Sequence, residues 1–464
     1  MPPEVCAYAL ARYSRSPDSI RQSLQWVRQH DSRRFFEHFY FQYGHASIAD
    51  LGHLALCLEG ISELAATEIE DEPLWDGQAK SSRYQDFSQA GVIKPPEFTP
   101  AEIELYQCAA AGLLQTYSRV QAAAAAAFAE RVPRPAEMAP EAYRRALNAR
   151  ACDVARYLLC LGVTTNVGQV TSIRTLEKQI RRLRVSEYAE LRELAEEMAQ
   201  ACAAPADCTW YETVPGEPPA PTLAQFAGPD EYLAAVRHDL RCWAEQNLPA
   251  PRPAHGPSVD LVRPVNAVAD AVATLLYPVS KHSFRELYEL AEGWSPAMRG
   301  EVLELAVRSR KERDELPRAF RSAPYAFDLI MDIGAWRDLH RHRRCYQFRQ
   351  PFTTHLGYET PPAVREIGLE PDYRAAIEQA LVVASRLPAP AAHYLLPFAT
   401  RSRFLFKMDF AEADYICRLR TSVKGHFSYR RIAWEMKLAL ERVEPELGRL
   451  IQATPPWVED LLTR

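Results

Sequence analysis

Two long segments of the chain carry apolar residues at helical spacing. In residues 102–130 and 373–387 apolar side chains recur every three or four positions, and neither segment contains proline. This periodicity predicts two amphipathic helices. Residues 33–44 and 324–334 are shorter and rich in aromatic and β-branched side chains, a composition that predicts strands. Together the patterns predict an α+β protein that is mostly helical.

The apolar pattern also repeats along the chain. Three pairs of segments share it and occur in the same order: 57–73 with 329–343, 153–165 with 389–401, and 188–198 with 427–436. Helices rich in alanine, leucine and arginine can resemble one another in single pairs, but that similarity does not explain the common order. We therefore predict an internal duplication, with a small sheet in each of two related halves.

Proline marks the connection between the halves. Residues 203–223 and 248–264 are rich in proline, which cannot continue a helix or a central strand. Between them, residues 229–246 have a helix-like pattern. The predicted division is an N-terminal half (1–215), a proline-rich connection with one helix (216–260) and a C-terminal half (261–464).

Composition narrows the classes of function. The 464 residues are 47% hydrophobic and 25% charged, as in ordinary globular proteins, and no apolar run reaches the roughly 20 residues needed to cross a bilayer. The N-terminal sequence is unlike a signal peptide and the ten cysteines include no C-x-x-C pair, so we expect a cytoplasmic protein with reduced thiols. A net charge of -5 argues against general binding to nucleic acids or membrane surfaces.

One segment departs from this acidic background. Residues 338–352 contain four arginines, two histidines and a cysteine. Because guanidinium groups bind phosphates and carboxylates, the segment indicates an anion site. A solvated arginine-rich loop is the common alternative, and nucleic-acid binding is a further one that the net charge disfavours. His340, His342 and Cys345 are metal-ligand types, but neighbouring guanidinium groups would repel a cation and the spacing fits no closed zinc site.

Several short motifs in the C-terminal half follow one another in a specific order. Arg341-His342-Arg343 is followed by LPFATRSR (396–403), CRLR (417–420) and GHFSYR (425–430). This order resembles the flavin-dependent thymidylate synthases, whose signature is an Arg-His-Arg triplet followed by Ser-x-Arg-Tyr, with His-x-Ser upstream. The resemblance covers most of the chain apart from the proline-rich connection.

Each half keeps the part of this signature that the other half has lost. The N-terminal half keeps His-x-Ser in YGHASIAD and Ser-x-Arg-Tyr in KSSRY, but Asp71, Glu72 and Pro73 stand at its triplet position. The C-terminal half keeps the triplet, but Pro351 and Thr353 stand where the Ser and Arg would be. The resemblance therefore implies one composite site that both halves build.

The resemblance also implies a role for each retained residue. Those it assigns to the flavin are His45, Ser47, Arg341, His342, Arg343, Arg420 and His426. Those it assigns to the nucleotide are Ser81, Arg83, Tyr84, Asp338, Arg403 and Arg430. Arg430 is given a catalytic role as well, because an arginine can polarise the pyrimidine carbonyl and stabilise developing negative charge.

The activity implied is reductive methylation of a pyrimidine nucleotide at C5, as in the conversion of dUMP to dTMP. FAD would mediate hydride transfer, NADPH would reduce the flavin and methylenetetrahydrofolate would supply the carbon. Since the family's sites lie between subunits of a homotetramer, a duplicated chain implies a homodimer with pseudo-tetrameric symmetry. Departures around the nucleotide, at Asp338 and Ala79, leave open another substrate or a non-catalytic homologue that binds flavin or nucleotide.

Overall fold

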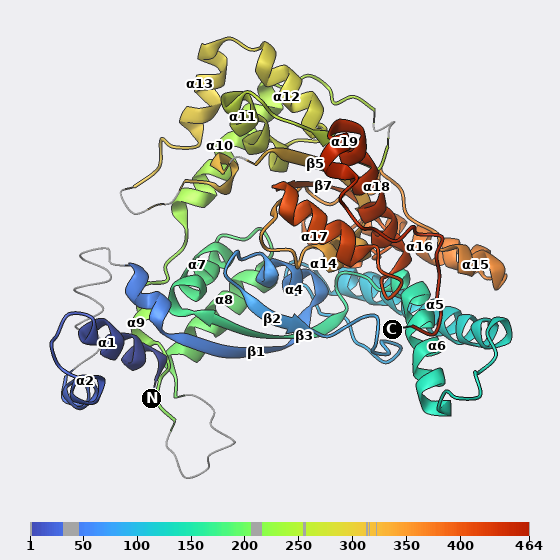
Figure 1. The fold of residues 1–464 in the computed structure, drawn as a ribbon, viewed down its shortest axis with the longest axis horizontal. Helices are drawn as coiled ribbons and strands as arrows, with labels where there is room; N and C mark the ends of the chain where they lie inside the picture. The colour runs from blue at the N-terminus through green and yellow to red at the C-terminus, as the bar shows by residue number, and fades with distance from the viewer. Residues whose placement is uncertain are drawn as a thin grey trace.

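The protein consists of many helices around two small antiparallel sheets (Figure 1). The structure is a computed structural model that describes residues 2–30, 46–205, 216–253, 257–311, 314, 316–321 and 323–463. Its mixture of helices and strands confirms the predicted α+β class. Within the ranges just given, no helix is both long and apolar enough to cross a membrane.

The N-terminal half contains a three-stranded sheet with strand order β1-β3-β2. Its elements are α1 (Pro3–Tyr13), α2 (Ile20–Val27), η2 (Ala46–Leu51), β1 (His53–Ser62), α4 (Glu63–Glu70), β2 (Asp76–Ala79), α5 (Pro100–Arg131), α6 (Pro140–Ala155), η3 (Arg156–Leu158), β3 (Thr164–Ser172), α7 (Ile173–Arg184) and α8 (Ala189–Ala203). The central strand β3 places Ser172 opposite His53 of β1 and Val170 opposite Asp76 of β2.

The C-terminal half contains a four-stranded sheet with strand order β4-β5-β7-β6. Its elements are β4 (Val259–Val262), α11 (Ala267–Leu276), η4 (Tyr277–Val279), α12 (Phe284–Gly293), α13 (Pro296–Leu305), η5 (Arg318–Phe320), β5 (Tyr325–Asp332), α14 (Ile333–Leu339), β6 (Tyr346–Arg349), α15 (Pro362–Glu366), α16 (Glu370–Ala384), η6 (Ala391–Leu395), β7 (Arg401–Met408), α17 (Phe410–Arg420), α18 (Phe427–Val443) and α19 (Pro445–Gly448). In the centre of this sheet, Asp332 of β5 lies opposite Arg401 of β7.

The two halves repeat one order of elements. The series β1, α4, β2, α5, β3, α7 and α8 corresponds to β5, α14, β6, α16, β7, α17 and α18. β2 and β6 are offset by 270 positions (346 − 76), and β3 and β7 by 237 positions (401 − 164). Ser62 and Asp332, which cap α4 and α14, each accept a hydrogen bond from the backbone amide three residues later. These correspondences confirm the predicted tandem arrangement.

The loops that precede β3 and β7 pair with each other. Four backbone hydrogen bonds join them: Leu161 N to Leu396 O (3.0 Å) with Phe398 N to Leu159 O (2.7 Å), and Gly162 N to Tyr394 O (2.6 Å) with Ala399 N to Tyr157 O (3.1 Å). In each pair, the two donors are 237 positions apart and so are the two acceptors, so each bond has its counterpart in the other half. The halves therefore face each other across a local two-fold axis, as the subunits of a symmetric dimer do.

Most of the buried apolar side chains form one cluster that runs through both halves. A smaller cluster joins α10 (Glu231–Asn247) to α11, α12 and α13, which stand together as a lobe in Figure 1. In the connection, α9 (Pro221–Phe226) packs on α8, and α10 is the helix that the sequence predicts at 229–246. β4 (Val259–Val262) includes residue 260, where the predicted connection ends and the predicted C-terminal half begins. The domain division itself stays a prediction.

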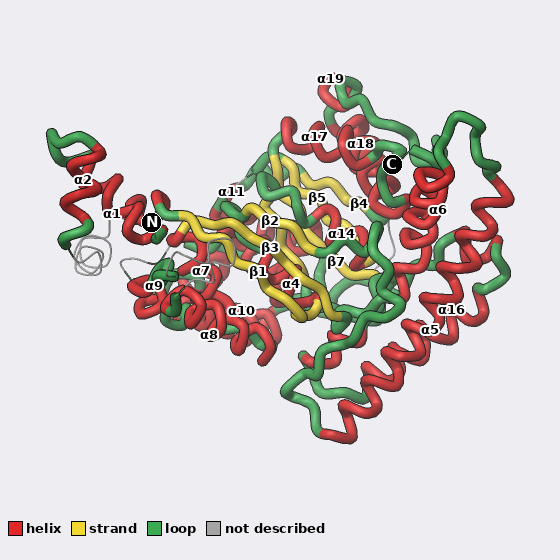
Figure 2. The backbone as a smooth tube through the Cα atoms, turned by 90° about the horizontal axis from the view of Figure 1, so that it is seen from below, coloured by secondary structure: helices red, strands yellow, loops and turns green. Residues whose placement is uncertain are grey.

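The strongest sequence patterns correspond to regular elements. α5 and α16 contain most of the two segments predicted as helices, and β5 lies within the strand predicted at 324–334, so these predictions are confirmed. Residues 33–44 lie outside the described residues. Figure 2 shows the strands of both sheets gathered in the middle of the molecule, with α5, α6 and α16 together toward one end.

Candidate functional site

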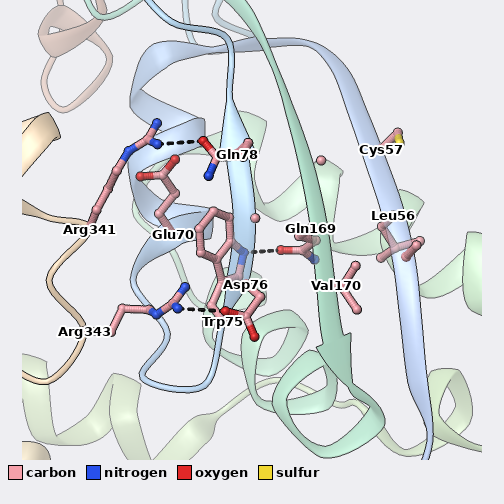
Figure 3. A pocket seen from close by; sticks show the side chains of 13 residues that line it. Leu56, Cys57, Glu70, Trp75, Asp76, Gln78, Gln169, Val170, Arg341 and Arg343 are labelled. Carbon is pink, nitrogen blue, oxygen red and sulfur yellow. Dashed lines mark hydrogen bonds and ion pairs between the residues drawn. The ribbon is translucent and has the colours of Figure 1, made fainter.

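A cavity of about 590 Å³ lies over the N-terminal sheet (Figure 3). Residues 55–57 of β1, 76–78 of β2 and 168–170 of β3 line it. Arg341 and Arg343 complete the lining from the turn between α14 and β6. We call this the triplet cavity. Because the sheet belongs to the N-terminal half and the arginines to the C-terminal half, both halves build it.

Arg341 and Arg343 both extend toward β2 (Figure 3). Arg341 Nη1 donates to Gln78 Oε1 at 2.9 Å, and Arg343 Nη2 donates to Asp76 Oδ1 at 2.7 Å. A guanidinium group has five N–H donors. One bond each therefore fixes the direction of these side chains and leaves most of their donors for an anion in the cavity.

An indole ring and two carboxylates complete the chemistry of the lining. Trp75 Nε1 donates to Gln169 Oε1 at 2.6 Å, and the Arg343 guanidinium lies 5.8 Å from the centre of the Trp75 ring system. Glu70 and Asp76 balance the charges of the two arginines. Trp75 is only 3% exposed, so its indole supports the wall of the cavity and offers no open face to a ligand. The cavity therefore suits a ligand with an anionic group, held at the free guanidinium edges.

The middle residue of the triplet points away from the cavity and fixes the turn. His342 Nε2 accepts a hydrogen bond from Arg420 Nε at 2.8 Å, so the ring proton is on Nδ1, 3.4 Å from Glu412 Oε1. Burial lowers the pKa of His342, and the neighbouring Arg420 charge adds to that effect. A neutral His342 thus ties the triplet to α17 through Arg420 and Glu412.

A second set of charged residues lies where the N-terminal half meets α18. Arg83 Nε donates to Asp153 Oδ1 at 2.9 Å, Nη1 to the Tyr429 hydroxyl at 2.7 Å and Nη2 to the Lys424 carbonyl at 2.9 Å. Arg83 is 9% exposed and Asp153 is 2% exposed. Protein acceptors therefore bind all three nitrogens of the Arg83 guanidinium. The ion pair with Asp153 lies within the N-terminal half, and the bonds to Tyr429 and Lys424 join it to the C-terminal half.

Asp338 takes part in the same set. Arg156, which is 1% exposed, donates from Nη1 to Asp338 Oδ2 at 2.9 Å. Burial works against ionisation, but the guanidinium groups of Arg156, Arg83 and Arg420 outweigh it and hold the pKa of Asp338 well below its usual range. We call Arg83, Asp153, Arg156, Asp338 and His426 the junction cluster.

His426 caps α18 inside this cluster. Its Nδ1 accepts from the Ser428 amide at 3.2 Å, so Nε2 carries the proton and donates to the Asp153 carbonyl at 2.9 Å. Burial lowers the pKa of His426 well below its ordinary value. Both ring nitrogens form hydrogen bonds within the protein. To bind flavin through its ring, His426 would have to break one of these two bonds.

Arg403 and Arg430 lie apart from the cluster's ion pairs. Arg403, on β7, donates from Nη1 to Asp328 Oδ2 at 2.8 Å. Arg430 donates to backbone carbonyls: Nε to Thr421 O at 3.0 Å, and Nη2 to Pro455 O at 3.2 Å and Val458 O at 2.8 Å. Arg430 therefore anchors the C-terminal segment that follows α19.

A sequence model of the family described as thymidylate synthase complementing protein matches residues 1–206 and 272–446. The chain belongs to the thymidylate synthase complementing protein family. The two matched segments cover most of both halves and omit most of the proline-rich connection.

Three curated proteins match most of the chain. The UPF0159 proteins of Chlamydia pneumoniae and Chlamydia muridarum are each 28% identical, over 86% and 89% of this chain and 76% and 79% of their own. The UPF0159 protein of Thermoplasma acidophilum is 26% identical over 96% of this chain and 94% of its own. Thymidylate Synthase X of Helicobacter pylori, solved with FAD and dUMP, is 15% identical, covers 43% of this chain and 89% of its own, and gives a TM-score of 0.26.

The other residues assigned through the family resemblance lie near the junction cluster or outside the described part. Ser81 Oγ accepts from the Arg83 amide at 3.3 Å in the turn after β2, and Tyr84 is exposed. His45 lies outside the described residues. Ser47 falls in η2, and its side chain is likewise not described. The roles of all these residues stay predictions.

Sequence reasoning missed the residues that hold the family motifs in place. Trp75, Asp76 and Gln78 belong to β2 or precede it, and a four-residue strand gives too short a pattern to recognise. Asp153 and Arg156 lie in the segment 153–165 that the repeat identified, so the repeat could have drawn attention to them. Nothing local in the sequence indicates that Arg156 binds Asp338, 182 positions away, or that the Asp153 carbonyl binds His426, 273 positions away.

Proposed function

We propose that the chain is an FAD-dependent enzyme that reductively methylates a pyrimidine nucleotide at C5, converting dUMP to dTMP or a related nucleotide. The observation that carries the proposal is the placement of Arg341 and Arg343 from one half over β2 of the other. Membership of the thymidylate synthase complementing protein family supports it, as does the solved Helicobacter pylori relative that holds FAD and dUMP.

The lining of the triplet cavity fits FAD in type and size. Its volume of about 590 Å³ falls inside the range of about 300–1,000 Å³ typical of small-molecule sites. Arg341 and Arg343 would hold the diphosphate through their free N–H donors. When bound, FAD would supply the hydride transfer on which the reaction depends.

The remaining roles fall to residues of both halves. His342 and Arg420 would keep the triplet turn in the orientation that presents its neighbours to the cavity. In the proposed site, His45, Ser47 and His426 would contact the flavin. Ser81, Arg83, Tyr84, Asp338, Arg403 and Arg430 would bind the nucleotide, with Arg430 polarising the pyrimidine carbonyl.

NADPH and methylenetetrahydrofolate are the co-substrates of the proposed reaction, and the proposed assembly is a homodimer. The local two-fold axis between the halves means that two chains supply four related units. Light scattering should therefore give a particle of two chains. A stable monomer that retains FAD would contradict the dimer. It would be consistent with a site that the two halves of one chain share.

A non-catalytic homologue that binds flavin or nucleotide is the second candidate. One observation favours it: the donors of Arg83 and Arg430 already bind protein acceptors, so a nucleotide phosphate would have to displace Asp153 or the C-terminal carbonyls. A turnover assay separates the candidates. Formation of dTMP from dUMP with FAD, NADPH and methylenetetrahydrofolate supports the enzyme, and tight binding of FAD without turnover of any pyrimidine nucleotide supports the homologue.

The test of the flavin site is an ultraviolet–visible spectrum of the purified protein, followed by calorimetry with FAD. We expect the flavin absorbance bands in the wild type. We also expect Arg341→Ala to weaken FAD binding by about tenfold or more, because it removes a charge-assisted contact of about 1.5–3 kcal/mol. Arg344→Ala is the matched control, since Arg344 belongs to the same turn, is exposed and does not line the cavity. Colourless protein that binds no FAD would refute the proposal.

A further inference from the structure

A second cavity lies against β6, the strand of the C-terminal half that corresponds to β2. Its volume is about 330 Å³, and β6 lines it as β2 lines the first. The offset of 270 positions relates His340 in this cavity to Glu70 in the other, and Asp71 here to Arg341 there. We call it the mate cavity. Its triplet position carries a carboxylate instead of a guanidinium group.

The charged groups around the mate cavity are mostly paired with one another. Arg318 Nη1 donates to Asp71 Oδ1 at 2.9 Å, and Arg349 Nη2 donates to Glu68 Oε1 at 2.8 Å. Arg182 lies 3.4 Å from Glu68 as well. A diphosphate would have to separate these pairs and approach Asp71, so this cavity is not a second flavin site.

Two polar groups that line the mate cavity have no such partner. Within the described part of the chain Arg237, on α10, makes no hydrogen bond and no ion pair. His340 is 7% exposed, and its Nε2 is buried without a hydrogen-bond partner. Gln347 donates from its amide nitrogen to the Leu339 carbonyl at 3.1 Å, which leaves Gln347 Oε1 as the acceptor for His340 Nδ1 at 3.1 Å. Nε2 of a neutral His340 is therefore a free acceptor.

Much of the remaining wall is apolar: Val236, Leu240, Leu275, Pro278, Trp336 and Phe348. An apolar cavity with a few convergent polar groups is the usual form of a small-molecule site. Its volume is at the small end of the usual range of about 300–1,000 Å³.

We propose that the mate cavity binds a small aromatic carboxylate that also carries an N–H or O–H donor. Arg237 binds the carboxylate, His340 Nε2 accepts from the donor, and the ring packs against Trp336 and Phe348. One unpaired guanidinium matches one negative charge, and one unpaired buried acceptor matches one donor. The proposal is independent of the flavin site, because none of the residues that line the mate cavity lines the triplet cavity.

The test is calorimetry of the full chain, saturated with FAD, with para-hydroxybenzoate as the probe. We expect one binding site per chain. Benzoate, which lacks the donor, should bind about fivefold more weakly, and para-cresol, which lacks the charge, about tenfold or more weakly. Arg237→Gln should weaken para-hydroxybenzoate binding by about tenfold to a hundredfold. Arg241→Gln is the matched control: like Arg237, Arg241 is an exposed arginine of α10, but it does not line the cavity, and its replacement should change nothing.

Three results would overturn the proposal. The first is that neither para-hydroxybenzoate nor benzoate gives a measurable heat of binding at millimolar concentration. The second is an equal effect of Arg237→Gln and Arg241→Gln in variants whose circular dichroism matches the wild type. The third is loss of probe binding in Arg341→Ala, which would place the probe in the triplet cavity. Loss of FAD binding in that variant with the probe still bound supports both sites separately.

Discussion

Replacing Arg83 with alanine should destabilise the protein by breaking a buried ion pair of the N-terminal half, and it also removes two hydrogen bonds to the C-terminal half. Arg83 is the main partner of the Asp153 carboxylate, and both side chains are buried. Breaking a buried ion pair costs about 3–5 kcal/mol, because it leaves a buried charge without compensation. Arg150 Nη1 lies 3.9 Å from Asp153 Oδ2 and can supply part of that compensation. We therefore expect the free energy of unfolding to fall by about 3 kcal/mol, the lower end of that range.

A double-mutant cycle with Asp153→Asn isolates the pair. The neutral amide removes the unpaired charge, so Arg83→Ala in the Asp153→Asn background should cost less than in the wild type. We expect a coupling energy of at least about 1 kcal/mol between the two positions. Urea denaturation followed by tryptophan fluorescence and by far-ultraviolet circular dichroism measures it, provided that the two transitions coincide.

The exposed pair Arg119 and Asp372 is the control: its nitrogen–oxygen distance is the same 2.9 Å, but its side chains are 57% and 47% exposed. Exposed ion pairs contribute about 0–1 kcal/mol, so Arg119→Ala should have little effect. Effects of Arg83→Ala and Asp153→Asn that add to within about 0.5 kcal/mol would refute the reasoning.

Three further predictions concern single positions. Gly162→Ala should destabilise the paired loops by about 1–3 kcal/mol, because the new Cβ would lie 1.9 Å from the Tyr106 hydroxyl; Gly168→Ala, with open space around its Cβ, is the control in thermal unfolding. Burial, reinforced by the Arg349 charge, lowers the pKa of His393 from 6.5 to about 4. Between these pH values the unfolded state binds more protons than the folded state. The free energy of unfolding should therefore fall by up to about 3 kcal/mol as the pH falls through this window. His393→Phe should reduce the slope of stability with pH in urea titrations, and the buried histidines His342 and His426 account for the slope that is left. An unchanged slope would contradict the assignment. Arg430→Ala should free the segment after α19, seen as faster chymotryptic cleavage at Trp457 than in the exposed control Arg449→Ala; equal rates would contradict the anchoring role.

Much of the fold could be predicted from the chain because its strongest elements carry regular patterns. α5 and α16 show helical periodicity throughout, and β5 is a compact run of aromatic and apolar residues. The duplication was predictable from the common order of three pairs of segments. The pairing of the loops before β3 and β7 was not, because it depends on backbone hydrogen bonds that place no demand on side-chain type except at Gly162.

The candidate site was predictable only in its residue types. The density of arginine pointed to an anion site at Arg341 and Arg343, but not to the strand that the two guanidinium groups face. For Arg83 and Arg430 the motif indicates a guanidinium group at each position. It does not indicate that carbonyls and a carboxylate of the same chain occupy their donors, because those partners come from distant segments.

The amount of FAD bound per chain tests the composite site most directly. The triplet cavity has its arginines, whereas at the mate cavity Asp71 is paired with Arg318 and repels a diphosphate. Protein saturated with FAD and freed of excess ligand should therefore contain one flavin per chain, by the ratio of flavin absorbance to protein concentration from amino-acid analysis. Two flavins per chain, or none, would contradict a single flavin site built by both halves.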